Sequence, residues 1–264
     1  MNQPESAASR STDIYFFATC VVDQFFPGAG MDAITLLERQ GIRVHFPEAQ
    51  TCCGQPAYTS GFPDEARKVA AHQLTLFPND WPVVVPSGSC AGMMKHHYPT
   101  LFAADPVRKA QAEQLSTRIY ELTDFLVHVL DFTPQDLGRD CTIVLHTSCS
   151  ARREMGVHLT GRKLLGDLAH VTVAQQDHES ECCGFGGTFS VKQPEISGSM
   201  VEDKVKALKA TGAERVVSAD CGCLMNILGH AAWKDQQAGL QKPSLPGEHI
   251  ASFLLRRTDK GAQA

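Results

Sequence analysis

The stretch Cys52-Cys53-Gly54 recurs 130 positions later, as Cys182-Cys183-Gly184, in a chain of 264 residues. A single cysteine precedes each doublet by 32 or 33 positions, and another cysteine follows it by 37 or 40 positions. In chain order, these four single cysteines are Cys20, Cys90, Cys149 and Cys223. Because three landmarks recur at offsets of 129, 130 and 133 positions, the sequence predicts a tandem duplication. We place the first repeat at residues 12–135 and the second at residues 136–258.

Short apolar runs alternate with helix-like segments in the same order in both halves. We predict three strands in each half, at residues 14–18, 42–46 and 83–85 and then at 141–146, 170–174 and 215–217. Apolar periodicity and position predict helices at residues 31–39, 64–77, 115–130, 161–169, 194–211 and 249–256. Asp64 is the expected N-cap of the second of these helices. Strands that alternate with helices are typical of parallel α/β units, so we expect two similar α/β domains with parallel sheets.

Every repeated cysteine follows a predicted strand. The carboxyl ends of strands form the binding crevice of an open α/β sheet, so each half would bring four thiols together. Adjacent residues of a strand point to opposite faces, so each doublet needs an irregular turn, which Gly54 and Gly184 allow. Four thiolates are the ligand set of an iron–sulfur cluster or of a structural zinc site. The predicted metal ligands are Cys20, Cys52, Cys53, Cys90, Cys149, Cys182, Cys183 and Cys223.

Two cysteines stand outside this repeat. Cys141 lies within an apolar strand-like run and is expected to be a packing residue. Cys221 has Gly88 as its counterpart in the first half, so it has no repeated partner. Its role stays open between a supporting ligand, a redox-sensitive thiol and a packing residue.

The glycines after the second doublet, in Gly184-Phe185-Gly186-Gly187-Thr188, could cradle a phosphate through backbone amides. Their place beside the doublet favours close approach to a cluster, whose sulfurs accept amide hydrogen bonds. The expected cofactor-binding glycines are therefore Gly54, Gly184, Gly186 and Gly187. Four histidines near the cysteines are expected to support a metal site or lie on the surface rather than to ligate: His96, His97, His146 and His178.

The composition and net charge argue against two classes of partner, nucleic acid and the lipid bilayer. The net charge of -5 and the isoelectric point of about 6.1 give no electrostatic footprint for nucleic acid. No apolar run approaches the roughly 20 residues of a membrane helix, so no membrane span is expected. Residues 1–11 are polar and show no secretory pattern, which favours the cytoplasm. In that reducing compartment, ten cysteines indicate metal or redox chemistry rather than disulfides.

Longer strings carry a family resemblance, at residues 86–90, 181–192 and 222–227. They resemble the cysteine-rich CCG domain that occurs in heterodisulfide reductase, in glycolate oxidase iron–sulfur subunits and, in the most similar form, in the lactate utilisation protein A family. The resemblance covers nearly the whole chain after about residue 12. It implies an iron–sulfur protein of L-lactate oxidation to pyruvate, in which the eight cysteines hold one or two [4Fe–4S] clusters. It also implies two companion proteins, a ferredoxin-motif iron–sulfur protein and a small third subunit.

The chain departs from the fullest CCG pattern at two positions. That pattern ends in C-x-x-C, whereas Ser87 and Asp220 stand here in place of the first cysteine of the pair. Four thiols per half favour a [4Fe–4S] cluster over the five-cysteine, non-cubane cluster of the heterodisulfide reductase branch.

The chain shows no ferredoxin run and no flavin or nicotinamide motif, so we predict an electron-relay subunit without catalytic residues. Partners would dock at exposed loops expected at residues 91–98 and 185–191. Two alternatives stay open. One is a thiol–disulfide redox enzyme like heterodisulfide reductase, and the other is an assembly scaffold stabilised by zinc.

Overall fold

The computed structural model describes residues 12–259, and each half of this range forms a four-stranded parallel sheet. The first sheet has the order β2-β1-β3-β4 and the second the order β6-β5-β7-β8. The first comprises β1 (Asp13–Phe16), β2 (Arg43–His45), β3 (Val83–Val85) and β4 (Ile119–Glu121). The second comprises β5 (Cys141–His146), β6 (Val171–Ala174), β7 (Arg215–Ser218) and β8 (Gly247–His249). The predicted tandem α/β duplication is confirmed. Residues 1–11, on which the expectation about a secretory leader rests, lie outside the described range.

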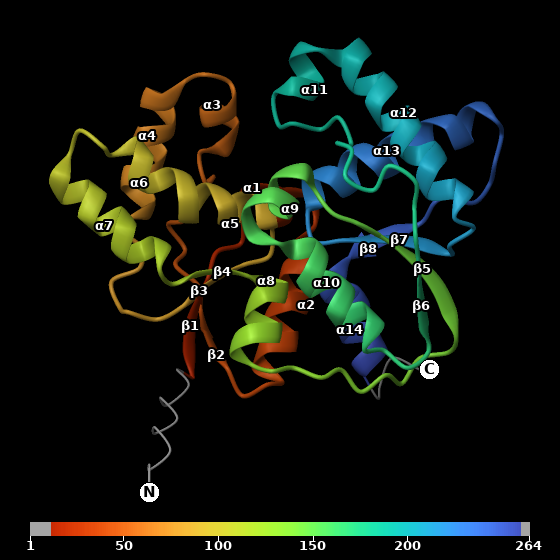
Figure 1. Ribbon diagram of the computed structural model, residues 1–264, viewed down its shortest axis with the longest axis horizontal. Coiled ribbons are helices and arrows are strands. Elements are labelled where there is room, and N and C mark those ends of the chain that lie inside the picture. The colour runs from red at the N-terminus through yellow and green to blue at the C-terminus, as the bar shows by residue number, and fades with distance from the viewer. Residues whose placement is uncertain (1–11, 260–264) are drawn as a thin grey trace, which may run out of the picture.

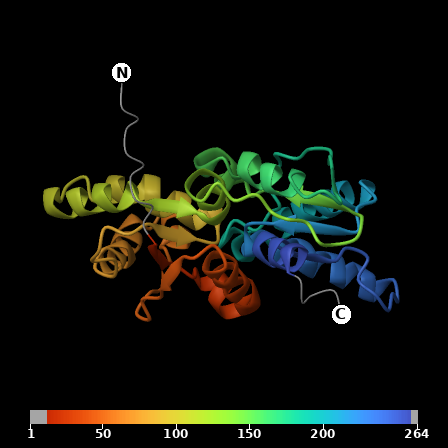
Figure 2. The ribbon, with the colours of Figure 1, turned by 90° about the horizontal axis from the view of Figure 1, so that it is seen from below.

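The pairing register of the strands repeats between the two sheets, as the strand order does. In the first sheet Tyr15 pairs with Val83 and Val83 with Ile119, and in the second sheet the central strands pair Val144 with Val216. All three residues of β3 are buried. Burial along a whole strand is typical of a parallel sheet covered by helices on both faces. Figure 2 shows such helices above and below the strands in both halves.

Helices follow the strands in a matching order (Figure 1). In the first half they are α1 (Cys20–Phe25), α2 (Pro27–Glu38), α3 (Gln55–Thr59), α4 (Pro63–Gln73), α5 (Gly88–Gly92), η1 (Met93–His97), α6 (Tyr98–Leu101), α7 (Pro106–Ser116), α8 (Leu122–Asp124) and η2 (Phe125–Val129). In the second half they are α9 (Cys149–Met155), α10 (Val157–Gly166), α11 (Phe189–Lys192), α12 (Pro194–Ala210), α13 (Cys221–Gln237) and α14 (Ile250–Thr258). Among residues 12–259, every helix is too short or too polar to span a lipid bilayer.

The two halves pack through reciprocal pairs of helices. Helix α5 packs on α9 as α13 packs on α1, and α8 packs on α10 as α14 packs on α2. Each contact therefore has a counterpart in which the halves exchange roles, as at an isologous dimer interface. The duplicated chain is arranged as a two-fold dimer of its own repeats.

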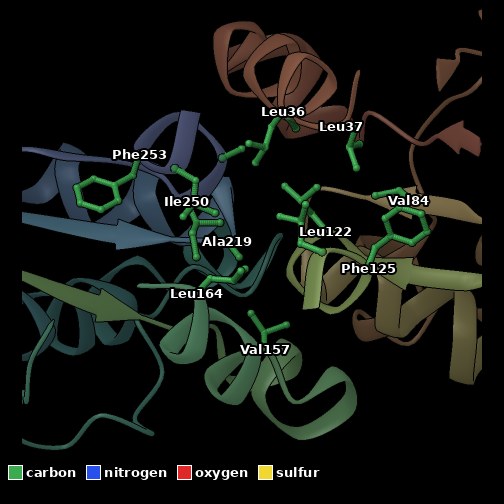
Figure 3. Packing of buried hydrophobic residues seen from close by; sticks show 14 of the residues in the cluster. Leu36, Leu37, Val84, Leu122, Phe125, Val157, Leu164, Ala219, Ile250 and Phe253 are labelled. Carbon is green, nitrogen blue, oxygen red and sulfur yellow. The ribbon is translucent and has the colours of Figure 1, made fainter. Parts of the chain in front are cut away.

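One hydrophobic core crosses the boundary between the halves (Figure 3). Leu36, Leu122 and Phe125 of the first half belong to the same buried cluster as Leu164 and Ile250 of the second half. Each such fully buried side chain contributes about 1.5–3 kcal/mol of transfer free energy. The shared core holds the ends of the two sheets at a defined separation, which positions the site.

The structure corrects the predicted elements in three places. A fourth strand, β4, occupies part of the predicted helix 115–130, and β8 precedes the predicted helix 249–256. Both strands have only three residues, and so short a run has no period that separates strand from helix. Asp64 is not an N-cap, since α4 begins at Pro63 after Phe62. Proline suits the first helical position because the backbone amide of that residue has no hydrogen-bond partner within the helix.

Candidate metal centre between the two halves

All eight predicted cysteines line one cavity of about 400 Å³. The cavity is bounded by both halves, so the thiols of the two repeats face a common space rather than two separate crevices. Four thiols come from each half, and we call them the first thiol set and the second thiol set. The first set is Cys20, Cys52, Cys53 and Cys90, and the second set is Cys149, Cys182, Cys183 and Cys223.

Strand ends and helix starts position the single cysteines. Cys20 and Cys149 are the first residues of α1 and α9, shortly after β1 and β5. The residue before each helix caps it, because the Val22 amide donates to Thr19 Oγ1 and the Ala151 amide donates to Ser148 Oγ. Such caps satisfy amides that the first helical turn leaves unpaired. The remaining single cysteines, Cys90 and Cys223, lie in the first turns of α5 and α13.

The doublets lie in tight turns that require glycine. Gly54 and Gly184 have φ angles of 86° and 82°, in the left-handed region. A Cβ atom at Gly184 would lie 2.7 Å from the Ser197 carbonyl oxygen, so no other residue fits without a shift. The amides of Gly54 and Gly184 donate to Cys52 Sγ and Cys182 Sγ, each at 3.4 Å. Gly186 and Gly187 also line the cavity.

Within each set the thiols contact one another in sequence. Cys149 Sγ donates to Cys182 Sγ at 3.8 Å. Hydrogen bonds from Cys149 and then Cys183 lower the pKa of Cys182 to about 2, and the bond raises the pKa of Cys149. In the first set, hydrogen bonds from Cys20 and then Cys53 lower the pKa of Cys52 to about 3. The lowered pKa of Cys52 and of Cys182 favours the thiolate, which is the form of cysteine that binds metals.

The donor set fits an iron–sulfur or other thiolate-bound metal group. Sulfur is a soft donor that suits iron–sulfur clusters and zinc, and four sulfurs per set match the ligand count of either. Amide donors to Cys52 and Cys182 are the hydrogen bonds that tune such clusters. The cysteines of the described range are all free thiols, so none is tied up in a disulfide.

Ser87 and Asp220, the two departures from the fullest CCG pattern, bond to each other across the halves. Asp220 Oδ1 accepts hydrogen bonds from Ser87 Oγ at 2.7 Å, from Ser89 Oγ at 2.8 Å and from the Ser89 amide at 3.2 Å. Ser87 and Asp220 are both buried. Comparison with the fullest CCG pattern identified these two positions, but only the fold shows that they meet. They join the two halves where a fifth cysteine would otherwise stand in each.

The two remaining cysteines differ in location. Cys221 is buried, lines the cavity and packs with Val22 and Ala29 of the first half. Burial raises its pKa. Cys141 lies at the start of β5, outside the cavity lining, where Arg257 Nη1 donates to its sulfur at 3.6 Å. The placement of Cys141 agrees with a packing role.

The burial and the unpaired ring of His146 could not be predicted from the sequence. It is fully buried at the end of β5, and neither ring nitrogen has a hydrogen-bond partner within residues 12–259. A ring nitrogen of His146 lies within 4.8 Å of Cys183 Sγ and Cys223 Sγ. By contrast, His96 bonds the Glu154 carbonyl at 3.0 Å and His97 pairs with the Glu154 carboxylate at 3.3 Å. His178 pairs with Glu181 at 3.1 Å.

The prediction of an exposed loop at residues 91–98 is wrong. Residues 91–98 form the end of α5, all of η1 and the start of α6, and most of their side chains are buried. Met93 and His97 of this segment line the cavity instead. The second segment, residues 185–191, borders the cavity through Phe185 and exposes Val191.

Comparisons with known proteins agree with this arrangement. The cysteine-rich domain family CCG matches the chain twice, at residues 14–95 and 143–228. The protein named lactate utilization protein A of Shouchella clausii (strain KSM-K16) is 46% identical over 82% of this chain and 90% of its own length. The lactate utilization protein A of Bacillus subtilis (strain 168) is 42% identical over 92% of this chain and 99% of its own length.

A solved structure shares the fold. The crystal structure of a hypothetical protein from Helicobacter pylori superimposes with a TM-score of 0.66 at 11% sequence identity. The match covers 96% of this chain but only half of that one, and at this identity it concerns the fold alone. Two CCG matches and relatives at this level of identity establish the family. The chain belongs to the lactate utilization protein A family and carries its cysteine-rich CCG domain twice.

Proposed function

We propose that this chain is the iron–sulfur redox subunit of a system that oxidises L-lactate to pyruvate, and that it relays electrons with partner proteins. The observation that carries the proposal is the pair of four-thiol sets that face one cavity. The similar proteins are named lactate utilization protein A, and that name supplies the substrate of the proposal. The eight cysteines would hold one or two [4Fe–4S] clusters. Every cysteine of the described range is a free thiol, and this favours a reducing compartment, namely the cytoplasm.

When bound, a cluster of this kind takes up and releases single electrons. The chain's own residues hold and shield the site. Gly54 and Gly184 stabilise the thiolate of each set through their amides. The shared core and the Ser87–Asp220 hydrogen bond hold both thiol sets at one cavity.

We expect the isolated chain, fully loaded with iron, to reduce no dye with L-lactate. Oxidation of a hydroxy acid removes two electrons and two protons, and the chain carries no flavin or nicotinamide motif to accept them together. The companions would be a ferredoxin-motif iron–sulfur protein and a small third subunit. A spectrophotometric dye assay with and without these companions tests the expectation. Activity that needs all three proteins supports the relay, and rapid oxidation by the chain alone would make it the catalyst.

A second candidate function is reduction of a disulfide, in which two electrons and two protons convert one disulfide to two thiols. The common cavity favours it, since one small molecule in about 400 Å³ could contact both thiol sets. The same dye assay, run with reduced dye and a panel of disulfides, separates the two functions. Turnover of a disulfide without the companion proteins would favour this second candidate.

A further inference from the structure

The two halves differ at the position three residues before the first thiol of each set. His146 lies three positions before Cys149, and Phe17 lies three positions before Cys20. Both side chains are fully buried. Phe17 packs on Phe77 with ring centroids 6.4 Å apart, so in the first half this position belongs to the apolar core. In the second half the same position carries a nitrogen donor.

No protein group satisfies this donor. Both ring nitrogens of His146 lack a hydrogen-bond partner in the described part of the chain. Buried polar atoms are normally bonded, because leaving one unpaired forfeits its interaction with water. A ring nitrogen of His146, Cys183 Sγ and Cys223 Sγ all lie within 4.8 Å of one another, close enough for one metal atom to contact all three. Among residues 12–259, no other group of three or more potential ligands meets this criterion.

The polar neighbours of His146 are committed elsewhere. Buried Gln176 donates to the Leu145 carbonyl at 2.7 Å. Buried Lys204 donates to the His178 carbonyl at 2.7 Å and to Gln176 Oε1 at 3.4 Å. The unpaired ring of His146 is therefore free to ligate a metal together with Cys183 and Cys223.

We propose that His146 supplies a ring nitrogen to the metal centre of the second thiol set. This inference rests on the proposed metal-binding function and deepens it, because the two halves then hold unlike centres. The first centre has thiolate ligands alone, and the second has thiolates and one imidazole. Histidine in place of cysteine raises the reduction potential of an iron–sulfur centre. Buried Lys204 beside the second set would act in the same direction, so a centre held there would have the higher reduction potential.

Cobalt(II) provides a spectroscopic test in the full-length chain. The double substitution Cys52→Ser and Cys53→Ser disables the first set, and the apoprotein is then titrated anaerobically with Co²⁺ alone. Visible absorption bands of thiolate-bound Co²⁺ report both affinity and the number of sulfur ligands. We expect His146→Phe, which copies the first half, to weaken Co²⁺ binding at least about tenfold and to shift the bands. His146→Cys should restore affinity with bands moved to longer wavelength, as a further sulfur ligand requires.

His146→Gln guards against a folding defect, since it keeps a buried polar side chain of similar reach and should lose Co²⁺ affinity as His146→Phe does. Circular dichroism of each variant checks the fold. Unchanged bands and affinity in either folded variant would overturn the proposal, and so would failure of the parent protein to bind Co²⁺. The proposed function is tested separately, by the iron and sulfide content of the unsubstituted protein. If the unsubstituted protein loads iron but the His146 substitutions do not change Co²⁺ binding, His146 is not a ligand and the proposed redox function still holds.

Discussion

Replacing Cys182 and Cys183 together by serine is expected to remove at least half of the iron that the protein binds on anaerobic reconstitution. The two residues supply half of the sulfur donors of the second thiol set, and the lowered pKa of Cys182 favours its thiolate. A serine hydroxyl is a harder, weakly acidic donor that iron–sulfur clusters do not select. Iron analysis and visible absorption measure the loss.

Cys141→Ala is the matched control, because it removes a thiol that lies outside the cavity lining. It should keep the full iron content and lower the free energy of unfolding by about 1 kcal/mol, as a small truncation. Full iron in the doubly substituted protein would show that the second set holds no metal. Loss of iron in Cys141→Ala would place a ligand outside the cavity.

Gly184→Ala is expected to destabilise the protein by about 2–5 kcal/mol and to reduce metal loading of the second set. An alanine at a φ of 82° costs about 1–2 kcal/mol. Its Cβ would also meet the Ser197 carbonyl oxygen at 2.7 Å, and overpacking of this kind adds about 1–3 kcal/mol. The shift that relieves the clash would displace the doublet and the amide that donates to Cys182. Chemical denaturation and iron analysis read the two effects.

Gly198→Ala provides the matched control for this prediction. Gly198 lies on the neighbouring helix α12, and a Cβ there would meet nothing within 4 Å. Alanine in a helix interior is more stable than glycine by about 0.5–1 kcal/mol, so this variant should gain stability and load metal normally. Equal stability of the Gly184→Ala and Gly198→Ala proteins would contradict the role assigned to the turn.

The spacing of the cysteines carried most of the sequence prediction. Equal offsets between the doublets and the single cysteines indicated the duplication, and strand-end positions indicated that the thiols gather. The α/β duplication is confirmed. The eight cysteines do line a common space, while their role as ligands and the domain limits at residues 135 and 136 stay predictions.

Two of the features that the sequence did not predict depend on contacts between the halves. A periodicity describes one segment at a time, so it could not show that Ser87 meets Asp220, 133 positions away. For the same reason it suggested two separate crevices where the structure has one cavity. In the sequence, the polar and histidine-rich residues 95–97 favour an exposed loop. In the structure, Met93 and Met94 before them are buried. The sequence signal for His146 is that the equivalent position of the first repeat carries Phe17. Only the structure shows that the His146 ring is buried and has no hydrogen-bond partner in the described part of the chain.

The proposed redox function can be tested by metal and sulfide analysis of the protein purified under strict exclusion of oxygen. We expect iron and acid-labile sulfide in equal molar amounts, with zinc at trace level, because a [4Fe–4S] cluster contains both elements in that ratio. Zinc bound without sulfide would refute an iron–sulfur function. The two thiol sets would then be structural sites of an assembly scaffold rather than carriers of electrons.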